Sequence, residues 1–172
     1  MVLRRHGVRR LASGGLRVTL SARERDALRS LPAQLRPIVS GEADEEPARA
    51  LRARLYPPAS TDAELEAEYR ELAGEELVAA RVDALETFAR TLGQGETRGA
   101  TWSVELQPED AQAWLGVVND ARLILAGVVG ITSEEQWERG FDADDPASAL
   151  LWYLGWLEEE LVGALLGSLP ER

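Results

Sequence analysis

The side chains that could carry chemistry in this sequence are few, and the acidic segment near residue 144 is the first of them. Asp142, Asp144 and Asp145 could supply oxygen ligands to a hard cation. The segment lacks the central glycine and the late glutamate that a calcium-binding loop requires. We therefore interpret it as a solvated loop whose last aspartate caps a helix.

Nucleophiles and proton-transfer groups are equally sparse. His6 is the only histidine, the chain has no cysteine, and no motif places a serine nucleophile beside that imidazole. The adjacent carboxylates of Glu75 and Glu76 could in principle act as general acid and base. With 30 acidic residues in the chain, however, such pairs arise on solvated faces without a catalytic role. The sequence predicts no catalytic residue, no cofactor and no metal ion.

Three polar residues, Asn119, Asp120 and Arg122, stand within the longest apolar helix that the sequence predicts. Their spacing places Asn119 and Arg122 on one helical face. One interpretation is structural: Arg122 pairs with a carboxylate of a neighbouring helix, because a charge at a packed surface must be compensated. The alternatives are a ligand or partner site, or an enzyme whose acidic cleft is lined by Arg122.

The charge of the chain is divided unevenly along its length. All 19 basic residues are arginine, and the formal net charge is −11. Residues 1–40 carry a net charge of +7, whereas the remainder carries −18. The basic start either docks on the acidic remainder or contacts nucleic acid, because clustered arginine attracts phosphate. The net charge disfavours nucleic acid. The arginines predicted for that alternative are Arg4, Arg5, Arg9, Arg10 and Arg17.

The last predicted helix carries an aromatic surface beside its core stripe. Leucines at helical spacing, from Leu150 to Leu165, predict the buried face. Trp152 and Trp156 lie off that stripe, and Gly163 continues roughly the same line. Tryptophan is enriched at interface hot spots, so this face is covered either by a neighbouring helix or by a partner, including a second copy of the chain. The predicted partner-binding residues are Trp152, Trp156, Gly163, Asn119 and Arg122.

The element that must position these residues runs from Thr101 to Ile131. The sequence predicts a short strand at 102–106, a start marked by Pro108, and one long helix. The helix's second half, Leu123–Ile131, is apolar on every side. Because a helix that is apolar all round must be covered all round, we expect it to be the central helix of the core.

The amino-terminal part of the chain predicts a small antiparallel sheet. Residues 7–20 form a β-hairpin around a Ser-Gly-Gly turn, and the strand at 102–106 joins it as a third strand. Gly95 and Gly99 mark a mobile loop before that strand. The whole chain, residues 1–172, is therefore predicted to be a single mainly α (α+β) domain, a helical bundle around the central apolar helix with a hairpin-plus-one-strand sheet.

Other helices are predicted from capping residues and periodicity. Ser21 and Glu24 form a capping box, after which Pro32 and Pro37 are expected to break the helix into short pieces. A long helix begins at residues 60–61 and carries two apolar stripes on either side of Gly74, which marks a kink. The first stripe is Leu65, Tyr69 and Leu72, and the second is Val78, Val82, Leu85, Ala89 and Leu92.

No apolar segment of the sequence reaches the roughly 20 residues that a membrane helix needs. We therefore expect a cytoplasmic protein without a membrane contact.

Two motifs resemble an actinobacterial family of unknown function, DUF2017. They are LQPEDAQAWLGVVNDARLILAGVVGI and the later ALLWYLGWLEEELVGALL, and the likeness extends over nearly the whole chain. The matching positions are Trp114, Leu115, Asn119, Asp120, Arg122, Leu123, Gly130, Tyr153, Leu154, Trp156 and Leu161.

The resemblance implies a functional context but no chemistry. Such proteins are usually encoded close to an adaptor of the Clp protease, which implies a role in regulated proteolysis or stress response. Some relatives are thought to be cysteine-based regulators of transcription, and that switch cannot operate in a chain without cysteine. We thus expect a non-enzymatic interaction or regulatory protein, with a homodimer, a nucleic-acid-binding regulator and an enzyme as alternatives.

Overall fold

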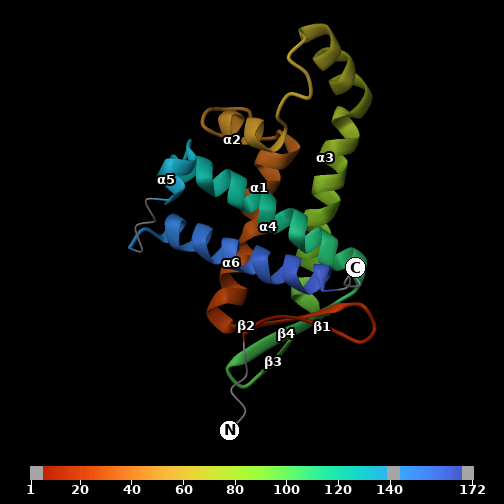
Figure 1. The fold of residues 1–172 in the computed structure, drawn as a ribbon, viewed down its shortest axis with the longest axis vertical. Helices are drawn as coiled ribbons and strands as arrows, with labels where there is room; N and C mark the ends of the chain where they lie inside the picture. The colour runs from red at the N-terminus through yellow and green to blue at the C-terminus, as the bar shows by residue number, and fades with distance from the viewer. Residues whose placement is uncertain (1–5, 139–143, 168–172) are drawn as a thin grey trace.

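The computed structural model describes residues 6–138 and 144–167, and in these ranges the chain forms six helices and four strands. The helices gather on one face of the small antiparallel sheet (Figure 1), so the predicted mainly α (α+β) class is confirmed. The elements in chain order are β1 (Gly7–Arg10), β2 (Leu16–Ser21), α1 (Ala22–Ser40), α2 (Ala48–Leu55), α3 (Ala63–Gln94), β3 (Glu96–Arg98), β4 (Thr101–Leu106), α4 (Pro108–Val129), α5 (Glu134–Glu138) and α6 (Pro146–Leu166).

The sheet has the strand order β1-β2-β4-β3, with β2 and β4 at its centre. Its apolar residues Leu16, Val18 and Leu20 are buried, while the alternate residues face outward. β4 pairs with β2 in the register Val18↔Val104, which confirms the predicted third strand. The expectation of a mobile loop before β4 is wrong, because β3 adds a second hairpin whose turn uses a glycine with positive φ at position 99.

The expectation that prolines break the first helix is also wrong. α1 runs from its Ser21 capping box to Ser40 through both Pro32 and Pro37. Each internal proline costs about 3 kcal/mol. Against this cost, the helix buries Leu28, Leu31, Leu35 and Val39, and each fully buried apolar side chain contributes about 1.5–3 kcal/mol. Tertiary burial therefore outweighs the local penalty.

α4 is the central helix, as its sequence predicts. It contacts α2, α3, α6 and β4, and its residues Trp114, Val118 and Ala121 are fully buried. The expectation that its second half is covered all round is wrong. In the segment Leu123–Ile131 only one side chain is fully buried, and Val128 is 58% exposed. α2 covers just one side of this segment.

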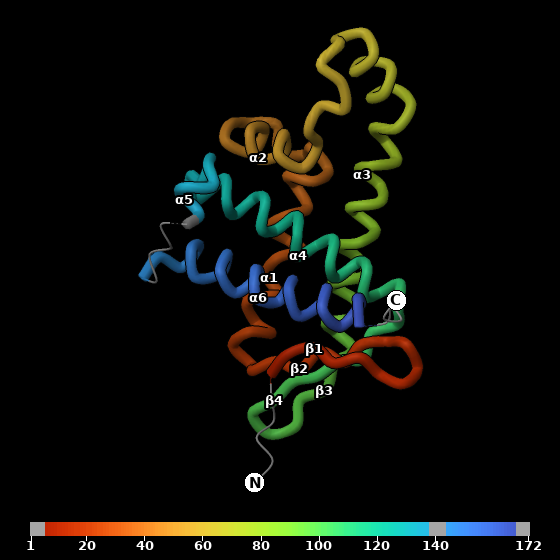
Figure 2. Tube along the Cα trace, in the orientation of Figure 1, coloured from red at the N-terminus to blue at the C-terminus, as the bar shows by residue number. Residues whose placement is uncertain are grey.

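α3 is one continuous helix of 32 residues, so Gly74 does not end it. Its carboxy-terminal half packs on α1 and α4 through Leu85, Phe88 and Leu92. Its amino-terminal half projects beyond the other helices at the top of Figures 1 and 2, and the first apolar stripe lies on that projecting half. Asp62 caps the helix, which begins at Ala63 and so slightly later than the predicted residues 60–61.

α6 lies beside α4 and runs in the opposite direction (Figure 2). Asp145 caps it by accepting hydrogen bonds from the backbone N–H and hydroxyl of Ser148 at 2.8 and 2.7 Å, which confirms the predicted cap. These hydrogen bonds lower the pKa of Asp145. The leucines Leu154, Leu157 and Leu161 of the predicted stripe are fully buried. Asp142, Arg4 and Arg5 lie outside the described residues.

Candidate functional site

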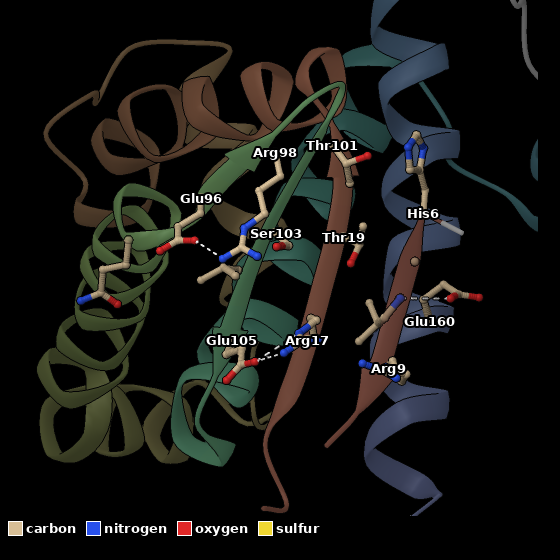
Figure 3. Close-up of a pocket in the computed structure, with 14 residues that line it drawn as sticks. His6, Arg9, Arg17, Thr19, Glu96, Arg98, Thr101, Ser103, Glu105 and Glu160 are labelled. Atoms are coloured by element: carbon tan, nitrogen blue, oxygen red, sulfur yellow. Dashed lines mark hydrogen bonds and ion pairs between the residues drawn. The ribbon is translucent and has the colours of Figure 1, made fainter. Parts of the chain in front are cut away.

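A shallow groove of about 1010 Å³ lies on the outer face of the sheet (Figure 3). Residues of all four strands line it, and along β2 and β4 the outward residues alternate with buried ones. Thr19 of β2 and Thr101 and Ser103 of β4 place small hydroxyl groups in its middle. The groove therefore offers hydrogen-bonding groups at its middle.

Charged side chains around the groove neutralise one another. Arg17 pairs across strands with Glu105, with its Nε 3.1 Å from the carboxylate Oε1. Arg98 Nη2 lies 3.0 Å from Oε2 of Glu96 (Figure 3). Arg9 lines the same groove and is exposed. The paired carboxylates reduce the attraction that this face has for phosphate.

α6 covers the edge of the sheet next to the groove. The carboxylate Oε2 of Glu160 accepts a hydrogen bond of 3.3 Å from the backbone N–H of Val8, an outward-facing group of edge strand β1. A Cβ at Gly7 would lie 2.7 Å from the same oxygen, and Gly7 has a φ of 138°. Glycine at this position thus permits both the backbone conformation and the close approach of α6.

Of the five arginines predicted for nucleic acid, the three that the structure describes, Arg9, Arg10 and Arg17, do not form one free patch. Arg9 and Arg10 are exposed on β1, but Arg10 does not line the groove. Arg17 is half-exposed and paired with Glu105. The hypothesis of a basic contact surface therefore depends on β1.

A second candidate surface is formed where α4, α5 and α6 meet. Arg122 of α4 pairs with Glu158 of α6, and its guanidinium lies 5.5 Å from the ring centroid of Trp137 on α5. Its Nε is 3.7 Å from the Cβ position of Gly155, and Trp152 stands one turn before that glycine. Trp152 is 66% exposed and Trp137 is 37% exposed. We call these two tryptophans and Arg122 the aromatic surface.

The other predicted partner-binding residues are placed differently. Trp156 is half-buried against the core, with its ring centroid 5.6 Å from that of Tyr153. Burial raises the pKa of Tyr153. Asn119 is exposed on α4, and Gly163 is exposed on α6 with no heavy atom within 4 Å of its Cβ position. Only Trp152 among these residues presents a large apolar group to solvent.

A buried polar network joins α1, α2, α3 and α4 and was not predicted. Arg81 Nε pairs with Asp120 Oδ2 at 3.1 Å, and burial raises the pKa of Asp120 despite this cation. The guanidinium groups of Arg81 and Arg52 each lie 4.9 Å from the ring centroid of Tyr56, whose hydroxyl donates to the carbonyl of Val39 at 3.1 Å. Burial also raises the pKa of Tyr56. The network thus links residues of α1, α2, α3 and α4.

In the described part of the chain, no group of three or more histidine, aspartate or glutamate residues could hold a metal ion. None of the described helices is long and apolar enough to cross a membrane.

A family model described as a domain of unknown function, DUF2017, matches residues 5–165. The chain belongs to the DUF2017 family. Comparisons with curated proteins and with solved structures gave no match. The predicted resemblance is therefore confirmed as family membership, while the actinobacterial source and the Clp neighbourhood remain predictions.

In this DUF2017 chain, the carboxylate that pairs with Arg122 of the aromatic surface could have been found from the sequence. Glu158 follows Leu154 by four residues, so helical spacing places it beside the buried stripe. That position distinguishes it from Glu159 as the carboxylate facing a neighbouring helix. No local signal identifies Trp137, because its contact depends on how the chain turns between α4 and α5.

Proposed function

We propose that this DUF2017 protein is a non-enzymatic regulatory protein that acts by binding another protein through its aromatic surface. The observation that carries the proposal is the 66% exposure of Trp152. An exposed indole gains apolar burial when a partner covers it, and tryptophan is enriched at binding hot spots. The ion pair of Arg122 and Glu158 joins α4 to α6, the helix that carries Trp152, which supports a preformed surface.

A cytoplasmic role in regulated proteolysis or stress response is the finer form of this proposal. It rests on the neighbourhood of a Clp-protease adaptor that the family resemblance implies, and it fits a chain whose candidate surface is suited to protein contacts. Redox sensing through a thiol is excluded, because the sequence has no cysteine.

The test uses the full chain with Trp152→Ala and a matched control, Leu166→Ala. Leu166 is 56% exposed near the other end of the same helix. Sedimentation equilibrium measures the mass of each protein, and immobilised proteins are compared for capture from cell extract. We expect Trp152→Ala to lose the partner or the dimer, while Leu166→Ala keeps it. Circular dichroism checks that both variants are folded.

Two outcomes would decide against parts of the proposal. If the wild type and Trp152→Ala are both folded monomers, the homodimer alternative is removed. If capture is also the same for wild type and Trp152→Ala, the aromatic surface is not the partner contact.

Nucleic-acid binding is a second candidate, and it is favoured by one observation. Arg9 and Arg10 are adjacent, exposed and without a recorded acidic partner among the described residues. A titration with random-sequence duplex DNA from low to high salt tests it, because phosphate contacts make affinity fall with salt. Absence of binding at low salt would exclude this candidate.

A further inference from the structure

The projecting half of α3 carries an apolar stripe that no other part of the described structure covers. Leu65 is 57% exposed, Tyr69 is 41% exposed and Leu72 is 75% exposed. Their spacing of four and three residues places them on one face of the helix. This half of α3 extends past α2 and α4 at the top of Figure 1.

Polar contacts, and not apolar burial, order this projecting helix. The side chain of Asp62 accepts from the backbone N–H groups of Glu64 and Leu65, which caps the first turn. The carboxylate of Glu66 accepts from the backbone N–H of Ala59 at 2.7 Å and from Arg70 Nε at 2.6 Å. The preceding loop is thereby tied to the helix. A binding face held in advance loses less entropy when a partner docks.

The stripe is bordered by carboxylates that have no basic partner among the described residues. Glu64, Glu68, Glu71 and Glu75 follow one another along one side of it, at the three- and four-residue spacing of a single helical face. No ion pair or hydrogen bond is recorded for these four side chains, all of which are exposed. Arg70, the one arginine of this half of the helix, is already paired with Glu66.

We propose that the stripe of Leu65, Tyr69 and Leu72 binds a basic amphipathic helix of a partner protein. The four-three spacing is that of a heptad seam, in which acidic flanking positions pair with lysine or arginine of the facing helix. A second copy of the chain would bring like charges together at these flanks. The elements next to the residues outside the described ranges are β1, α5 and α6. In Figures 1 and 2 these elements lie away from the projecting end of α3.

This inference deepens the proposed function and rests on it, because it names the chemistry of a protein partner at a separate surface. The probe is a labelled synthetic peptide of about three heptads with leucine at the seam and lysine at the flanks. A second peptide carries glutamate at the flanks. Fluorescence anisotropy measures their affinity for the full-length protein, for Leu72→Ala and Leu65→Ala, and for the control Leu166→Ala. All three leucines are more than half exposed, so folding is retained, and thermal melts check this.

We expect the basic peptide to bind the wild type and the control equally, and each stripe variant about tenfold more weakly. These variants keep the net charge, so such a loss cannot come from general attraction to an acidic protein. Glu68→Gln with Glu75→Gln should weaken binding and flatten its salt dependence.

Several results would overturn the inference: no binding of the basic peptide, unchanged affinity in Leu72→Ala, or equal affinity for the glutamate peptide. A wild-type dimer that Leu72→Ala dissociates would make a second copy the occupant. Trp152→Ala should leave peptide affinity unchanged. The basic peptide could fail to bind while Trp152→Ala still loses partner capture. That pair of results would reject the stripe as a binding site and retain the aromatic surface as the partner contact.

Discussion

The contact between Arg122 and Glu158 decides whether the polar cluster on α4 is structural or free to serve a partner. The two side chains are only 27% and 18% exposed, and they join the two helices that contact each other most extensively. If the pair is structural, removing either charge leaves the other poorly solvated. The informative variants are Arg122→Met, which keeps the aliphatic stem, and Glu158→Gln, which keeps the shape.

The expected magnitude lies between two limits. Solvent-exposed ion pairs contribute about 0–1 kcal/mol, and breaking a fully buried pair costs about 3–5 kcal/mol. Because Arg122 and Glu158 retain about a quarter and a fifth of their exposure, we expect each single variant to lose about 2 kcal/mol. We expect a coupling energy of similar size in the double-mutant cycle.

Urea denaturation followed by circular dichroism measures these free energies. With an m value of about 2 kcal/mol/M, each single variant should lower the midpoint by about 1 M. The cross-strand pair Arg17 and Glu105 is the control, since its side chains are 41% and 55% exposed. Its coupling energy should stay below about 1 kcal/mol.

A coupling energy for Arg122 and Glu158 no larger than that of the sheet pair would refute this reasoning. The α4 arginine would then be free of a structural role. Its guanidinium and the adjacent Trp137 would belong to the partner surface alone.

Three other predictions concern single positions. Thr91→Val should lower the free energy of unfolding by about 1–3 kcal/mol, because it removes the buried hydroxyl acceptor that lies 2.8 Å from Trp114 Nε1. Urea denaturation measures this loss, and an unchanged free energy would show that the indole finds another partner. Burial raises the pKa of Asp120 above its ordinary value of 3.8, so its contribution to stability is present below that value and is lost as pH rises through the raised pKa. Asp120→Asn should therefore gain stability relative to the wild type as pH rises above 3.8, and a difference that stays constant with pH would contradict this. Gly95→Ala should destabilise the protein by about 1–3 kcal/mol, because its Cβ would overlap the indole of Trp102 on β4. The Cβ of Gly93→Ala meets no atom within 4 Å, so this variant should stabilise α3. Thermal melts compare the two variants, and equal melting temperatures would contradict both expectations.

Local chemistry made several elements predictable from the sequence. The capping box of Ser21 and Glu24 forms as expected, with hydrogen bonds of 3.2 and 2.6 Å in its two directions. The cap at Asp145 and the hairpin of residues 7–20 also form where turn and capping residues place them. In each case the signal and the structure lie within a few residues of each other, so no distant contact had to be known.

Elements that depend on distant contacts were not predictable in the same way. α1 continues through Pro32 because its buried leucines contact other helices, and no local pattern expresses that gain. β3 forms because β4 offers a pairing edge, although Glu96 and Arg98 are exposed and its three residues carry no apolar alternation. Exposure at the end of α4 likewise depends on how much of it α2 can cover. Tertiary packing therefore accounts for the differences between the predicted and the observed elements.

The two apolar stripes of α3 could both be found in the sequence from their helical spacing. The same spacing also gives the angle between them around the helix. At 3.6 residues per turn, Leu85 lies about 200° around the helix from Leu65. One straight helix therefore cannot bury both stripes against the same neighbours. The helix is continuous through Gly74, and its first half extends beyond the helices that cover its second half. The first stripe therefore has no neighbour among the described residues to cover it, and the carboxylates beside it favour a basic partner surface.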